Sequence, residues 1–184
     1  MQLSAEEKVF LLKVARETVT RVVCDKPPLT YQPVSDVTGQ CRGAFVTLKK
    51  NGQLRGCIGL IEGMKPLVET VQEMAVAAAV RDPRFDAVSE EELEELDIEV
   101  SAMSPIRTVE DAAQIEVGRD GLIVRRAGQQ GLLLPQVATE YGWDRETFLE
   151  QTCRKAGLPP DAWKMEGTEI CSFSAEVFGE KELP

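Results

Sequence analysis

One short run of the chain places side chains that could do chemistry on a backbone with space beside them. It is Leu54-Arg55-Gly56-Cys57-Ile58-Gly59, which holds one thiol and one guanidinium among two glycines. Side chains alternate between the two faces of a strand, so Arg55 and Cys57 are expected to share one face. Glycine inside a strand is typical of close approach by a ligand or another backbone. Gly56 and Gly59 are therefore candidate substrate-binding positions.

The chemistry of Cys57 has two interpretations. In the first, it is a nucleophile or redox thiol, and the cation of Arg55 favours the reactive thiolate. Side chains two apart on a strand are separated by about 6 to 7 Å, so the long arm of Arg55 has to bend toward the sulfur. In the second, Cys57 is a small core residue and Arg55 makes a structural ion pair. The sequence leaves both interpretations open.

Two further segments supply candidate groups. Arg81-Asp82-Pro83-Arg84-Phe85 follows a predicted helix, and the fork of Arg84 suits either an anionic ligand or a carboxylate that ties down a loop. The segment from Leu132 to Glu140 joins an apolar strand to a polar turn, where Gln136 and Glu140 are candidates for a cleft or for a turn-stabilising role. The candidate catalytic residues are Cys57, Arg55 and Glu140, and the candidate substrate-binding residues are Gly56, Gly59, Arg84 and Gln136.

Composition removes several mechanisms. The 184 residues contain no histidine, which excludes Cys-His and Ser-His dyads and imidazole metal ligands within the chain. Five cysteines without a C-x-x-C pair indicate reduced thiols, so no metal site and no cofactor is predicted. A formal net charge of -10 makes nucleic acid an unlikely partner.

The chain also carries no sign of a membrane or secretory address. No apolar run reaches the roughly 18 to 20 residues that a membrane span needs. The first residues lack the basic region and apolar core of a signal peptide. A cytoplasmic protein without a membrane partner is therefore predicted.

Periodicity predicts the elements that position these residues. Ser4 with Glu7 is a capping-box pattern, Asp144 can cap a helix, and Asn51-Gly52 is a hairpin-turn signal. Residues 25–42 are expected to form an ordered arm or loop. Segments 43–103 and 121–178 both follow the order hairpin, helix, helix, strand, which predicts a duplicated unit within a single domain of residues 1–184. The second unit has no thiol that matches Cys57, so a site is expected on the first hairpin. Helices are predicted over residues 4–23, 66–81, 89–96 and 147–156, and strands over 45–48, 54–60, 98–103, 122–125, 131–134 and 170–178.

Several motifs occur here in one order: Leu54 to Gly59, Asp82-Pro83-Arg84-Phe85, Ile98-Glu99-Val100-Ser101, Leu133 to Ala138 and Lys155 to Leu158. Together they resemble the AMMECR-one domain family, whose prokaryotic members are called AmmeMemoRadiSam system protein A. The resemblance implies an α+β fold with flanking helices and a twisted, barrel-like antiparallel sheet built from a duplicated unit. It also implies association with a Memo-like protein and a radical S-adenosylmethionine enzyme, but no settled reaction.

Three kinds of function follow. The first is an accessory role beside the Memo-like and radical S-adenosylmethionine proteins, which is favoured because the sequence shows no internal dyad or metal cluster. The alternative is an enzyme that uses Cys57 and Arg55 on an anionic or carbonyl-bearing small molecule. An RNA-related binding module is the weaker third, since the acidic charge opposes it and the predicted strands lack paired aromatic residues.

Overall fold

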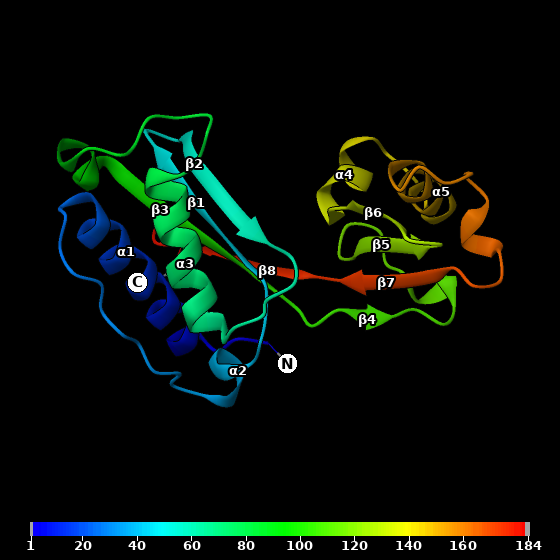
Figure 1. Cartoon of the computed structure of the whole chain (residues 1–184), viewed down its shortest axis with the longest axis horizontal. Helices are drawn as coiled ribbons and strands as arrows, with labels where there is room; N and C mark the ends of the chain where they lie inside the picture. The colour runs from blue at the N-terminus through cyan, green and yellow to red at the C-terminus, as the bar shows by residue number, and fades with distance from the viewer. Residues whose placement is uncertain (1, 183–184) are drawn as a thin grey trace. The chain divides into compact units, whose positions relative to one another are not determined.

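The computed structural model describes residues 2–182, which form two compact units (Figure 1). Unit 1 contains residues up to 105 and from 176 on, and unit 2 contains residues 106–175. Each unit has its own four-stranded antiparallel sheet. The predicted mixture of helices with antiparallel sheet is confirmed. Across residues 2–182, every helix is too short or too polar to cross a membrane.

The sheet of unit 1 has the strand order β2-β1-β3-β8. Helices α1 (Ala5–Val23) and α3 (Leu67–Val80) pack on one face of it and share its core, and Figure 1 shows α3 in front of the strands. In β1 (Ala44–Lys50), alternate residues are buried against these helices, while the residues between them are half-buried and lie on the other face. The strands are β1 (Ala44–Lys50), β2 (Gln53–Leu60), β3 (Leu96–Met103) and β8 (Ala175–Gly179).

Local signals explain where the elements of unit 1 begin and turn. The amide of Glu7 donates to the Ser4 hydroxyl and the amide of Ser4 donates to the Glu7 carboxylate, so a capping box starts α1 as predicted. Asn51 and Gly52 have φ of 52° and 79°, the left-handed values that a tight hairpin turn between β1 and β2 requires. Two short helices complete the unit, α2 (Asp36–Gly39) and the 3-10 helix η1 (Glu90–Glu95).

Unit 2 has the strand order β4-β7-β5-β6. Helix α5 (Arg145–Lys155), which Asp144 caps as predicted, packs on the hairpin of β5 and β6 through the buried Phe148 and Leu149. The strands are β4 (Arg107–Thr108), β5 (Gly121–Arg126), β6 (Gln129–Leu133) and β7 (Glu169–Phe173), and the remaining helices are α4 (Pro135–Glu140), η2 (Ala112–Gln114) and η3 (Ala162–Lys164).

The structure corrects three expectations about the fold. The strands form two separate sheets, not one barrel-like sheet. The strand predicted over residues 170–178 is two strands, β7 and β8, which belong to different sheets. The segment after Leu134 is the helix α4, not a turn, because Pro135 occupies the first helical position, where a missing amide proton costs nothing.

The two sheets have matching strand orders. In each, a hairpin lies at the edge, a third strand lies beside it, and a fourth strand completes the sheet. The chain passes from β3 into β4 and from β7 into β8, so each fourth strand continues from the third strand of the other sheet. Duplication of one unit stays a prediction.

Candidate functional site

Cys57 lies near the middle of β2, on the face of the sheet that the helices leave uncovered. It pairs across the hairpin with Thr47, whose hydroxyl donates a hydrogen bond to Cys57 Sγ at 3.2 Å. Thr47 pairs on its other side with Glu99, whose carboxylate binds Lys49 Nζ at 2.9 Å. Cys57 is half-buried, so its thiol sits among polar groups of a partly open face.

Arg55 lies at an irregularity of β2 and is bound by a carboxylate. The pairing between β1 and β2 shifts after Leu48, so Gly56 and Leu54 pair with successive residues of β1 and Arg55 has no cross-strand partner. Such a bulge breaks the simple alternation of faces. Both Arg55 Nε and Nη2 lie 2.9 Å from oxygens of the Glu92 carboxylate. The guanidinium therefore binds η1, which is the structural ion pair of the second interpretation.

The contacts of Arg55 have a clear electrostatic effect. Its guanidinium, helped by the amide of Ser89 and by Lys50, lowers the pKa of Glu92 from 4.5 to about 2. Glu92 in turn raises the pKa of Arg55. Arg55 Nη1 also donates to the carbonyl of Asp86 at 2.9 Å. The pair therefore stays ionised at neutral pH and fastens the segment before η1 to β2.

A second ion pair fastens the corner after α3 to Cys57 itself. Arg84 binds the Asp82 carboxylate through two hydrogen bonds: Nε donates to Oδ1 at 3.0 Å and Nη2 donates to Oδ2 at 2.8 Å. The Cys57 amide donates to Asp82 Oδ2 at 2.8 Å, and Arg84 Nη2 donates to the Cys57 carbonyl at 3.1 Å. The side chain of Arg84 and the backbone amides of Cys57 and Arg84 all donate to the Asp82 carboxylate. These hydrogen bonds hold the pKa of Asp82 well below its usual range, although burial acts to raise it.

Asp82 is a member of the site that the sequence did not single out. Its side chain is only 2% exposed, while that of Arg84 is 54% exposed. The signal that could have found it is an acid placed before Pro83 at the end of a helix, with an arginine two residues later. Such an acid can accept from the arginine and from a neighbouring strand at once.

Phe85 lies within cation–π range of both paired arginines. Its ring centroid is 6.0 Å from the Arg55 guanidinium carbon and 5.5 Å from that of Arg84. Glu92 and Asp82 bind these two guanidiniums, so both cationic neighbours of the ring are themselves held in place. We call Arg55, Phe85 and Arg84 the Arg–Phe–Arg surface.

The space at the two glycines of β2 is filled by the protein. A Cβ on Gly56 would lie 2.3 Å from the carbonyl oxygen of Ala78 in α3. A Cβ on Gly59 would lie 2.2 Å from the ring of Phe45 in β1. These glycines admit a helix backbone and an aromatic ring, and leave no room for a ligand at their Cβ positions.

The remaining candidates belong to the other unit. Gln136 and Glu140 lie on α4 with exposed side chains, next to the stacked rings of Tyr141 and Trp143, whose centroids are 4.9 Å apart. They lie in unit 2, whereas Cys57 and Arg84 lie in unit 1. In the described part of the chain, no three cysteine, aspartate or glutamate side chains are grouped to hold a metal ion.

The fold and the site define an α+β protein with two antiparallel sheets and an ion-paired corner on its first hairpin. The AMMECR1 family model matches residues 12–178, and the chain belongs to this family, as the motifs predict.

Similar proteins come from several archaea. A protein of Methanothermobacter thermautotrophicus is 46% identical over 185 residues, which cover 97% of this chain and 96% of that protein. Protein TK0174 of Thermococcus kodakarensis is 45% identical over 188 residues, 95% of this chain and 90% of its own. The crystal structure of the uncharacterized protein PH0010 from Pyrococcus horikoshii matches 100% of this chain and 96% of that chain, with a TM-score of 0.77 and 39% identity. Its fold is the fold described above.

Proposed function

We propose that this protein is an accessory component that docks a partner protein through the Arg–Phe–Arg surface. The family supplies the expected partners, a Memo-like protein and a radical S-adenosylmethionine enzyme. In this role the protein contributes binding surface, and its partners carry the redox chemistry.

The observation that carries this proposal is that the Phe85 ring lies within 6.0 Å of two guanidiniums that are themselves held by carboxylates. Carboxylates of Glu92 and Asp82 already hold Arg55 and Arg84 in place. Side chains that are ordered before binding lose less conformational entropy when a partner arrives. Arginine and aromatic residues are also the types enriched at the centres of protein interfaces.

Exposure and charge define the partner's side of such an interface. More than half of the Arg84 side chain is exposed, on a chain whose net charge is -10. Leu54, next to Arg55 in β2, is 45% exposed. The partner is expected to offer a carboxylate to Arg84 and an apolar side chain to Phe85.

Titration calorimetry with the recombinant Memo-like protein and the radical S-adenosylmethionine enzyme tests the proposal. Phe85→Ala should weaken binding of the true partner by roughly tenfold or more, as expected for the centre of an interface. Phe85→Leu, which keeps apolar volume but removes the ring, should have an intermediate effect. Thermal unfolding of each variant checks that it remains folded.

Val177→Ala provides the matched control. Val177 is an apolar residue on β8 of the same unit, 54% exposed and remote in sequence from the Arg–Phe–Arg surface. It should bind like the wild type. The proposal fails if neither partner binds the wild type, or if Phe85→Ala and Val177→Ala bind equally well.

A Cys57-dependent enzyme acting on an anionic or carbonyl-bearing small molecule is the second candidate. The contact of the Thr47 hydroxyl with Cys57 Sγ favours it, because it places a polar group beside the thiol on the partly open face. Cys57→Ser should then abolish turnover by the assembled system while partner affinity stays unchanged. Unchanged turnover in Cys57→Ser would exclude this candidate.

A further inference from the structure

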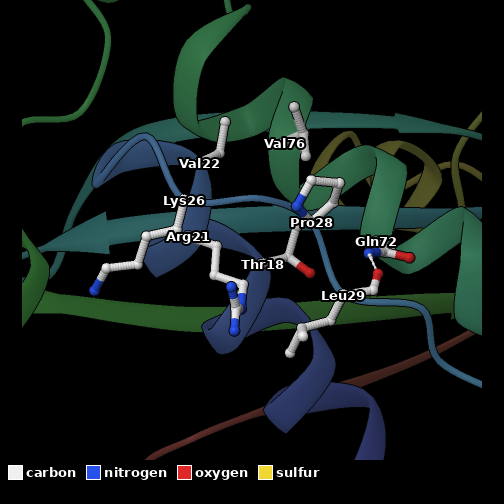
Figure 2. Close-up of a pocket in the computed structure, with 8 residues that line it drawn as sticks. All are labelled: Thr18, Arg21, Val22, Lys26, Pro28, Leu29, Gln72 and Val76. Atoms are coloured by element: carbon white, nitrogen blue, oxygen red, sulfur yellow. Dashed lines mark hydrogen bonds between the residues drawn. The ribbon is translucent and has the colours of Figure 1, made fainter.

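A pocket of 230 Å³ lies in unit 1 between α1, α3 and the loop that follows α1 (Figure 2). The loop is tied to both helices, because Arg21 Nη1 donates to the Pro27 carbonyl at 2.8 Å and Gln72 Nε2 donates to the Leu29 carbonyl at 2.7 Å. None of the residues that line the pocket belongs to the Arg–Phe–Arg surface. The lining residues are Thr18, Arg21, Val22, Lys26, Pro28, Leu29, Gln72 and Val76.

The hydroxyl of Thr18 is the unusual polar group of this pocket. Thr18 is only 6% exposed, and its Oγ1 is buried with no hydrogen-bond partner. Two other helical threonines donate to the carbonyl four residues back: Thr20 to Arg16 at 2.9 Å, and Thr152 to Phe148 at 2.7 Å. A buried hydroxyl without an acceptor is costly. Thr18 therefore lacks the acceptor that a ligand could supply.

The charge of the lining points to an anion. Two of the lining residues, Arg21 and Lys26, are cations and none is an acid, although the chain has 31 acidic and 21 basic residues. Thr18 and Arg21 are three residues apart on α1, so they face the same side of the helix. The rest of the wall is mostly aliphatic and includes Leu29 and Val76.

We propose that this pocket binds a small amphipathic monocarboxylate. Its carboxylate pairs with Arg21 and Lys26 and accepts the hydrogen bond of Thr18, while its apolar body lies against Leu29 and Val76. Since a cavity of about 150 Å³ holds a benzene ring, this one suits a ligand of roughly 8 to 12 non-hydrogen atoms. The site is independent of the proposed docking function.

Octanoate is a suitable probe, titrated into the full-length, isotope-labelled protein and followed by the NMR shifts of backbone amides. Saturable shifts are expected for residues of α1, α3 and the loop between 24 and 30. Octan-1-ol keeps the apolar body without the charge, and acetate keeps the charge without the body. Each should bind at least about tenfold more weakly than octanoate, because each lacks one half of the recognition.

Variants test the role of individual side chains. Thr18→Val keeps the shape and removes the unpaired hydroxyl, so the melting temperature should stay equal or rise while octanoate binds about three- to tenfold more weakly. Lys26→Gln should also weaken binding. Lys13→Gln, an exposed change on the same helix, is the matched control and should bind like the wild type.

Four results would overturn the proposal, and the first three concern affinity. They are no saturable octanoate binding up to about 10 mM, octan-1-ol binding as well as octanoate, and unchanged octanoate affinity in Thr18→Val. Shifts confined to residues outside the pocket would also overturn it.

Discussion

The two hairpins of the chain are built alike and differ in what is attached to them. In β2, Gly56 faces α3 so closely that a Cβ would lie 2.3 Å from the carbonyl oxygen of Ala78. In β6, Gly131 faces the end of α5, and a Cβ would lie 2.3 Å from the amide nitrogen of Ala156. The next residue is a thiol, Cys57, in the first hairpin and an alkyl side chain in the second.

The two units differ in the segment that follows the helix packed on each hairpin, which is α3 in unit 1 and α5 in unit 2. After α3, Asp82 and Arg84 fold back on the backbone of Cys57. After α5, the carbonyl of Gly157 accepts a single hydrogen bond from the Gln129 side chain at 3.3 Å. In the described part of unit 2, residues 156–160 after α5 carry no charged side chain and so form no corner of this kind. The corner of unit 1 is therefore an addition to the framework, and it builds the surface proposed above for docking.

The largest expected effect tests the shared part of this comparison. Gly56→Ala and Gly131→Ala should each lower the free energy of unfolding by about 3 kcal/mol or more, because the new methyl group meets helix backbone. Urea unfolding of both variants measures it. A loss in only one variant would show that the two hairpins do not share a framework.

Turn glycines supply the control. Gly52 and Gly128 have φ of 79° and 81°, and a Cβ on either would meet nothing within 4 Å. Alanine there adds only backbone strain, so each variant should lose about 1 kcal/mol.

The next effect concerns the corner that unit 2 lacks. Asp82→Asn removes the buried charge and replaces one of the two oxygens that accept from Arg84 and the Cys57 amide with an NH2 donor. It should cost about 2 to 3 kcal/mol of unfolding free energy. In unit 2, Asp144→Asn replaces one helix cap by another and should change stability by less than about 0.5 kcal/mol. Equal effects of the two substitutions in denaturant unfolding would contradict the assigned role of Asp82.

Glu92→Gln tests the other ion pair through its pH dependence. The folded protein lowers the pKa of Glu92 from 4.5 to about 2, so the folded state binds this proton less tightly than the unfolded state. The stabilisation is present in full above the unfolded pKa and is lost as the pH falls toward 2. The variant should be less stable by about 1 to 2 kcal/mol at neutral pH.

Below pH 2 the carboxyl is protonated in the folded state as well and resembles the amide, so wild type and variant should approach equal stability. Denaturant unfolding at several pH values measures this convergence. A stability gap that stays constant with pH would contradict the ion pair.

The smallest effect compares the thiols of the two units. Cys41 is exposed and Cys57 is half-buried, whereas burial raises the pKa of Cys153 and Cys171 in unit 2. Iodoacetamide should therefore label Cys41 readily, Cys57 no faster, and the two buried thiols only after unfolding. Mass spectrometry of the labelled peptides gives the rates. Labelling of Cys57 more than about tenfold faster than Cys41 would favour the enzyme over the accessory component.

Local signals explain why much of the fold could be predicted from the sequence. The capping box at Ser4 and the Asn51-Gly52 turn depend on residues a few positions apart, and both are confirmed. The break between β7 and β8 depends on which distant strands pair with each half. Strand β4 is two residues long and exists through its pairing with β7. Such nonlocal pairing leaves little trace in a short window of sequence.

The site shows the same limit. The motifs pointed to β2 and to the corner after α3, and the structure joins these two segments at Cys57. The partner of Arg55 was missed because a bulge depends on the register with β1, which alternation alone cannot give. Asp82 was missed because its burial depends on packing against β2, where the amide of Cys57 donates a hydrogen bond to its carboxylate.

Hydrogen exchange of the protein with and without its partner compares the two hairpins in one experiment. If the corner on the first hairpin is the docking surface, amides of residues 53–57 and 84–92 should exchange more slowly in the complex. Amides of residues 129–140 in unit 2 should exchange at the same rate in both samples. Protection of the second hairpin, with none at the first, would contradict the account.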